Sequence, residues 1–265
     1  MRYIAACAFL ATSPAFAELI EPDEVATLPS ADVIFLGEVH DNPAHHEVQA
    51  RAIEAIAPAA LVFEMLTDEQ ADAMPAQLLP EAELNEVLGW DGTGWPDFAL
   101  YYPLFEAAPT AQVFGAALPR EAARAAMGQD ADQVFTGDAA RFGLMAPLPE
   151  DQQAAREDLQ AKAHCDALPE EMLTGMVAIQ RLRDAMLAEA ALRAFEQTGG
   201  PVVVITGTGH ARTDWGAPYL LEQAAPEVTL LSVGQFEIAP EDAPPFDYWV
   251  VTDPHPRPDP CEMFQ

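Results

Sequence analysis

The chain contains a series of short apolar runs, each of which ends at a glycine, a proline or a polar residue. Uninterrupted runs of this length are typical of parallel strands that are covered on both faces. We therefore predict an α/β fold, in which a mainly parallel sheet is flanked by helices. The expected strands are residues 32–37, 60–65, 112–116, 201–206, 228–233 and 248–252.

A helix is expected between the first two strands. Asn42 is a suitable N-cap, and Pro43 suits the first helical position because its fixed φ is compatible with a helix. The helical pattern continues to about Ala57, and Pro58 ends it. A strand, a tight turn, a helix and a second buried strand form a βαβ unit, so these two strands should be parallel.

The segment from about Pro119 to Thr198 shows helical patterns and no strand. We expect it to form a smaller helical subdomain, residues 119–198, inserted into an α/β domain of residues 18–118 and 199–252. A proline-rich tail, residues 253–265, follows.

Polar residues interrupt the apolar face of a long helix predicted from about Pro169 to Gln197. Gln180, Arg183 and Asp184 lie at one level of this helix, and its apolar stripes continue on both sides of that level. Burying such groups is costly unless they pair or face a polar cavity. Two interpretations stay open: a structural Arg183–Asp184 network, and a ligand cavity lined at this level.

The first strand leads into the segment Gly37-Glu38-Val39-His40, and His45 or His46 adds a further donor from the first turn of the helix. In parallel sheets the carboxyl end of a strand and the next helix N-terminus border the usual ligand crevice. Glu38 and His40 alternate along an extended chain, so their side chains can share one side. Capping and surface polarity are the simpler alternative, although capping needs fewer polar groups.

The segment Gly207-Thr208-Gly209-His210 repeats this arrangement after the run at 201–206. If the two strands are close neighbours, Glu38, His40 and His210 meet at one edge of the sheet, and Glu64 can join them from the end of the second strand. Two imidazoles and a carboxylate suit a divalent transition metal, or the iron or propionates of haem.

An aromatic cluster precedes the third expected strand. Packing in the core explains most of its members. The alternative is a flat apolar wall with a phenol, because a tyrosinate can ligate ferric haem iron. The members of the cluster are Trp90, Trp95, Phe98, Tyr101, Tyr102 and Phe105.

Charge and motifs exclude several functions. With 12 basic and 43 acidic residues, the net charge of −31 repels phosphate backbones, so we expect no binding to nucleic acid. Arg212 stands where the third glycine of a dinucleotide-binding fingerprint belongs. After residue 17 the only serines are Ser30 and Ser232, and neither lies in a nucleophile elbow.

The first 17 residues resemble a secretory signal peptide that ends in Ala15-Phe16-Ala17, so we expect an exported, periplasmic protein. A lipid anchor at Cys7 is the less favoured alternative. Export makes a disulfide between Cys165 and Cys261 the natural inference, although two free thiols are the alternative.

Four blocks of the sequence resemble the ChaN-like haem-binding uptake proteins of the Tiki/TraB superfamily. Together they run from about residue 31 to residue 233. The blocks are Gly37-Glu-Val-His-Asp-Asn-Pro-Ala-His-His46 with Gln49, Trp95-Pro-Asp-Phe98 with Tyr101 and Pro103, Gln180-Arg-Leu-Arg-Asp-Ala-Met-Leu-Ala188, and Gly207-Thr-Gly-His210 with Gly216-Ala-Pro-Tyr219.

This resemblance implies haem bound as a cofacial pair between two subunits, with a tyrosine on the iron. Tyr101 is the first choice for that ligand and Tyr219 the second. It also implies a homodimer, a role in haem or iron uptake or storage, and an outer-membrane haem or iron receptor as a partner. Further expected haem contacts are His46, Gln180, Arg183 and Asp184.

The same superfamily contains metal-dependent proteases built on two Gly-x-x-His motifs. A metal-dependent hydrolase is therefore the alternative function. Glu38 would then be the general base, with His40 and His210 as metal ligands or acid–base groups and Glu64 as a further metal ligand.

Overall fold

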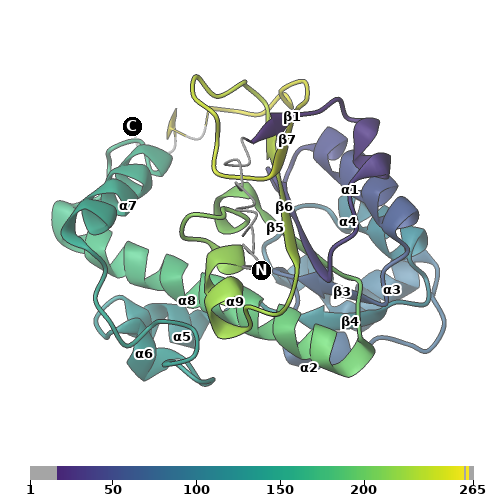
Figure 1. Ribbon diagram of the computed structural model, residues 1–265, viewed down its shortest axis with the longest axis horizontal. Coiled ribbons are helices and arrows are strands. Elements are labelled where there is room, and N and C mark those ends of the chain that lie inside the picture. Colours follow the sequence, from purple (N-terminus) through teal and green to yellow (C-terminus); the bar gives the residue numbers. More distant parts are fainter. Residues whose placement is uncertain (1–16, 260, 263–265) are drawn as a thin grey trace, which may run out of the picture.

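The computed structural model describes residues 17–259, 261 and 262. Within them, seven parallel strands form one sheet in the order β1-β7-β6-β2-β5-β3-β4 (Figure 1). The predicted α/β fold with a parallel sheet is confirmed. The strands are β1 Glu18–Leu19, β2 Val33–Glu38, β3 Ala60–Phe63, β4 Gln112–Gly115, β5 Val202–Gly207, β6 Leu230–Phe236 and β7 Tyr248–Val251.

All six predicted strands are present, with small differences in their ends. The largest difference is in β6, which continues three residues beyond Val233. Gln235 is polar but buried, since its side-chain amide donates to the carbonyls of Gly37 and His45. The two-residue strand β1 was not predicted, because so short a strand produces no apolar run.

Helices cover both faces of the sheet, which explains the unbroken apolar strands. Val33 and Phe35 of β2 pack on the side of α8, whereas Ile34 and Leu36 pack on the side of α1 and α4. The helices are α1 Pro43–Ile56, α2 Asp68–Asp72, α3 Glu81–Leu88, α4 Phe98–Ala107, α5 Arg120–Ala126, α6 Ala131–Val134, α7 Glu150–Ala163, α8 Glu170–Thr198 and α9 Ala217–Ala224, with 3₁₀ turns η1 Glu24–Thr27, η2 Trp90–Gly92 and η3 Thr208–His210.

The long helix α8 connects two parts of the molecule (Figure 1). Its second half, from Leu182 to Ala194, contributes to the core against β3, β4 and β5. Its first half extends beyond the sheet and packs on α5, α6 and α7. We call α7 and the first half of α8 the arm. The division into an α/β domain and a subdomain of residues 119–198 stays a prediction.

The C-terminal tail is attached to the body at two places. Arg257 forms hydrogen bonds with the carboxylates of Asp41 and Glu237 at 2.6–2.8 Å. A disulfide joins Cys261 to Cys165, which follows α7, as the sequence predicted. The tail therefore connects the sheet edge to the arm.

Two expectations about the chain's cellular setting concern its ends and its helices. The predicted signal peptide lies outside the described residues except for Ala17. In the described part of the chain, no helix is both long and apolar enough to cross a membrane.

Candidate functional site

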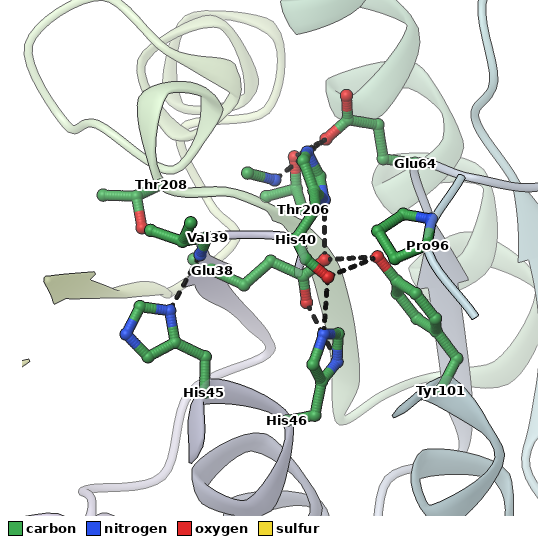
Figure 2. A network of polar contacts seen from close by, with 12 residues as sticks. Glu38, Val39, His40, His45, His46, Glu64, Pro96, Tyr101, Thr206 and Thr208 are labelled. Atoms are coloured by element: carbon green, nitrogen blue, oxygen red, sulfur yellow. Dashed lines mark hydrogen bonds and ion pairs between the residues drawn. The ribbon is translucent and has the colours of Figure 1, made fainter. Parts of the chain in front are cut away.

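A row of alternating carboxylates and imidazoles lies at the carboxyl ends of β2, β5 and β3. Glu38 Oε1 is 2.7 Å from His40 Nδ1, and His40 Nε2 is 4.0 Å from Glu64 Oε2 (Figure 2). On the other side, Glu64 Oε1 is 3.7 Å from His210 Nε2, and His210 Nδ1 is 2.6 Å from Asp184 Oδ1. We call these five residues the acid–imidazole row. Glu38, His40 and His210 therefore meet at one edge of the sheet, as expected.

The strand order explains this meeting. β5 lies between β2 and β3, and Glu38 is in register with Gly207. The absence of a side chain at Gly207 matters, because a Cβ there would lie only 3.0 Å from His40 Nε2. Likewise, a Cβ on Gly37 would lie 2.8 Å from the Cα of Thr208. The two Gly-x-x-His segments thus pack closely because their first residues are glycines.

Glu64 is the central carboxylate of the row, and it is buried. Thr206 Oγ1 donates a hydrogen bond to its Oε2 at 2.7 Å, and the backbone N–H of Gly207 donates another at 2.9 Å (Figure 2). Burial alone would raise the pKa of Glu64, but the two imidazoles and the two hydrogen bonds lower it to about 2. Glu64 is therefore ionised at neutral pH.

The carboxylates of the row raise the pKa values of both imidazoles. Burial lowers the pKa of His210, but the charges of Glu64 and Asp184 outweigh this effect and the pKa lies above 6.5. Burial likewise lowers the pKa of His40. The hydrogen bond to Glu38 and the charge of Glu64 outweigh this effect, so the pKa is raised. The row thus stabilises imidazolium cations between carboxylates.

A cavity of about 630 Å³ opens beside Asp184 and His210, which is within the usual size of small-molecule sites. One wall is the arm, and the other is the loop of residues 237–247 between β6 and β7. We call it the arm cavity. Its apolar lining includes Leu159, Ala163, Val177, Phe236, Pro244, Pro245 and Phe246.

Two arginines and a tryptophan form the polar end of the arm cavity. The Arg212 guanidinium lies 3.9 Å from the centre of the Trp215 ring, and that of Arg156 lies 5.2 Å from it. Both arginines and Trp215 line the cavity. In a chain with 12 basic residues against 43 acidic ones, this placement favours an anionic ligand with an apolar body.

A second cavity of about 260 Å³ borders the first. It shares Arg156, Asp184 and Trp215 with the arm cavity, and Tyr219 of α9 lines it. We call it the α9 cavity. Tyr219 is 39% exposed, so its side chain is accessible from solvent.

Comparison with known proteins identifies the family. Residues 25–221 match the family described as haem-binding uptake, Tiki superfamily, ChaN. This chain belongs to the ChaN family. No curated protein sequence matches it.

The fold resembles that of a solved ChaN structure. ChaN of Campylobacter jejuni, described with cofacial haem binding, superposes with a TM-score of 0.66 at 20% identity, covering 86% of this chain and 89% of that chain. A succinoglycan biosynthesis protein superposes less well, with a TM-score of 0.39 at 12% identity, covering 84% of this chain and 72% of that chain.

Of the residues expected to contact haem in this ChaN-family chain, only some lie at the arm cavity. Gln180 and Asp184 line it, together with His210. Arg183 is not among the lining residues, although its positive charge opposes protonation of His40 and His210. At this interruption in the pattern of the long helix, Asp184 binds His210 and also lines the cavity. No hydrogen bond or ion pair joins Asp184 to Arg183 within the described part of the chain.

The two tyrosines expected as iron ligands lie in different surroundings. Tyr101 is completely buried, and its hydroxyl donates a hydrogen bond of 2.9 Å to Glu38 (Figure 2). Burial and the charge of Glu38 raise the pKa of Tyr101 far above 10, which disfavours a tyrosinate. Tyr219 is the more accessible of the two. An iron-ligand role for either one stays a prediction.

His46 was also expected at the haem site, but its surroundings do not favour this role. It is 2% exposed, its Nε2 lies 2.9 Å from the carbonyl of His40, and its ring packs on Tyr101. It lines a pocket of about 650 Å³ between α1 and α4 rather than the arm cavity. The aromatic cluster likewise serves as core, since Trp90, Phe98 and Phe105 are buried against the sheet.

The metal alternative is not supported. Among the described residues, no three His, Cys, Asp or Glu side chains are arranged to hold a metal ion. His40 and His210 both face Glu64, but at 3.7–4.0 Å as ion pairs.

Sequence reasoning missed Arg156, Arg212 and Trp215. Arg212 and Trp215 come directly after the second Gly-x-x-His segment, so their position was a usable signal. Arg156 lies on α7, which contains few apolar residues and offered no interrupted pattern.

Proposed function

We propose that this ChaN-family protein binds haem in the arm cavity and acts in haem or iron uptake or storage. The observation that carries the proposal is the cavity itself. It combines apolar and aromatic walls with two arginines, and haem combines a flat apolar ring with two carboxylates. Family membership supports the same ligand.

The residues present fit this ligand. Phe236, Phe246 and Val177 would contact the ring, while Arg156, which lies beside Arg212 at one end, would bind an acidic group. Arg156 Nε is buried with no hydrogen-bond partner within the described part of the chain. When bound, haem supplies an iron atom that can be stored or transferred.

The remaining expectations belong to this proposal. They are an exported, periplasmic location, a homodimer with a cofacial haem pair, and delivery from an outer-membrane haem or iron receptor. The cofacial arrangement described for the Campylobacter jejuni protein supports the second of these.

Titration of the purified protein with hemin, followed by absorption, tests the proposed function. Ala163→Trp should weaken binding strongly, because Ala163 lies at the surface of α7 and lines the cavity, and a large side chain there fills it. Ala155→Trp is the matched control, since Ala155 is an exposed residue of the same helix outside the cavity lining.

The two variants separate two failures. If wild-type protein shows no saturable hemin binding, haem is not the ligand. If Ala163→Trp binds hemin as tightly as Ala155→Trp does, haem binds elsewhere. Native mass measurement of the loaded protein gives the number of haems and of subunits.

A further inference from the structure

Arg156 has an unusual environment for an arginine. Its side chain is 9% exposed, and burial lowers its pKa. Taking a guanidinium out of water is unfavourable unless its charge and its donors are compensated. The partners of Arg156 therefore indicate whether it serves the fold alone.

Compensation of Arg156 within the chain is incomplete. Its Nη2 donates to the carbonyl of Trp215 at 3.1 Å and to Gln152 at a marginal 3.5 Å. The nearest carboxylate oxygen, Asp184 Oδ2, is 3.8 Å from Nη1, which is too long for a hydrogen bond. Asp184 is instead bound by His210 at 2.6 Å.

Arg212 differs, because its charge is already paired. Its Nε and Nη2 donate to the two carboxylate oxygens of Asp214 at 2.9 and 2.6 Å. Held in this way, the Arg212 guanidinium lies against the Trp215 ring and makes the cavity end flat. Of the two arginines, Arg156 is thus the one with a buried N–H group, at Nε, that has no hydrogen-bond partner among the described residues.

The other acidic residues of the cavity lining do not form an ion pair with Arg156. Glu241 and Asp242 belong to the loop of residues 237–247, where both are exposed to solvent. The remaining wall near Arg156 is uncharged and includes Leu159 and Val177 together with Gln160. A ligand that satisfies this end therefore needs a carboxylate on an apolar body.

We propose that Arg156 is the carboxylate-binding residue of the arm cavity and selects tetrapyrroles by their free acid groups, whatever metal the ring holds. This inference rests on the haem-binding function proposed above. The ring lies among the apolar walls, and one propionate-type carboxylate accepts hydrogen bonds from the Arg156 guanidinium. Metal-free protoporphyrin IX is then a ligand, and its dimethyl ester is a poor one.

The test compares these three probes by quenching of tryptophan fluorescence in one detergent-containing buffer. Hemin and protoporphyrin IX should bind the wild-type protein within about tenfold of each other, and the dimethyl ester about 10- to 100-fold more weakly than the diacid, as expected for loss of a charged hydrogen bond. Arg156→Gln should weaken binding of the diacid by a similar factor and leave the ester unchanged.

Two further variants distinguish recognition from structure. Arg156→Lys keeps the charge and should restore part of the preference for the diacid. Arg51→Gln removes an exposed arginine that pairs with Asp23 far from the cavity lining, so it should bind as wild type does.

An ester that binds the wild-type protein as tightly as the diacid overturns the inference, whether or not Arg156→Gln folds. An unchanged preference in a folded Arg156→Gln also overturns it. If hemin still binds in either case, the proposed function is retained. If no tetrapyrrole binds, both the proposed function and this inference are wrong.

Discussion

The imidazole of His210 and the carboxylate of Asp184 share a hydrogen bond of 2.6 Å between Nδ1 and Oδ1. Asp184 belongs to α8 and His210 to η3. The bond therefore connects the helix that carries the arm to the edge of the sheet. On its other side His210 faces Glu64, so a buried imidazole lies between two carboxylates.

The first prediction concerns the pH dependence of this contact. The folded pKa of His210 lies above 6.5, so its contribution to stability is fully present below pH 6.5 and is lost as pH rises through the folded pKa. The difference in free energy of unfolding between wild type and His210→Asn should therefore shrink with rising pH. Urea unfolding from about pH 5 to about pH 9 measures it.

The variant must be compared with wild type at each pH, because the contribution of His45 to stability changes with pH in the opposite direction. Burial lowers the pKa of His45 to about 4, so its contribution is lost as pH falls from 6.5 toward 4. Leu192→Ala, at a buried apolar position of α8, is the control and should give a difference independent of pH. A His210→Asn difference that is constant or grows with pH contradicts the prediction.

The second prediction separates the two tyrosines. Tyr101→Phe removes the phenol that donates to buried Glu38, so it should destabilise the protein by about 1–3 kcal/mol. Because Tyr101 does not line the arm cavity, hemin affinity should change by less than about twofold. Tyr219→Phe should leave stability nearly unchanged, since Tyr219 is 39% exposed. Tyr219 lines the α9 cavity, which borders the arm cavity, so this variant should alter the absorption spectrum of bound hemin.

Thermal unfolding and hemin spectra of both variants check this prediction. A tyrosinate-type spectrum that disappears in Tyr101→Phe and persists in Tyr219→Phe would show that Tyr101 leaves the core to bind iron. If the tyrosinate-type spectrum is kept in both variants, neither tyrosine is the iron ligand.

Much of the fold follows from local sequence signals. Asn42 and Pro43 begin α1 where predicted, and Asn42 Oδ1 accepts a hydrogen bond from the backbone of Ala44. The strands were found because both faces of a parallel sheet are buried and leave long apolar runs. The meeting of His40 and His210 followed from two strand ends with the same Gly-x-x-His spacing.

The arm cavity could not be predicted in the same way. One of its walls is a loop between β6 and β7, which has no periodic pattern, and the opposite wall is α7, whose surface is largely polar. Arg156 and Phe246 are far apart in the sequence and line the same cavity only in the folded chain. The burial of Tyr101 also depends on tertiary packing, because the sequence of α4 favours a core helix but is also compatible with a cofactor wall.

The third prediction concerns the attachment of the tail by Arg257. The hydrogen bonds from Arg257 lower the pKa of Glu237 to about 2, so this contribution to stability is present above pH 4.5 and is lost as pH falls toward 2. Arg257→Ala should destabilise the protein by about 0.5–1.5 kcal/mol at neutral pH, because the ion pairs are only partly buried.

Urea unfolding at neutral pH and at about pH 3 measures the effect, which should be smaller at the lower pH. Arg120→Ala is the control, since the Arg120 side chain donates only to the carbonyl of Thr93 among the described residues. Equal losses in the two variants would mean that the tail is not held by Arg257.

The last prediction concerns the disulfide between Cys165 and Cys261, which are 96 residues apart. Closing so long a loop restricts the unfolded chain, so Cys165→Ser should destabilise the protein by about 2–4 kcal/mol. A reductant should lower the midpoint of urea unfolding of the wild-type protein to that of Cys165→Ser and leave the variant unchanged. If the reductant has no effect on the wild type, the two cysteines are not paired. The tail is then held only at the sheet edge, by Arg257 and by the backbones of Asp253 and His255. The wall of the arm cavity formed by α7 is free to move relative to the loop of residues 237–247.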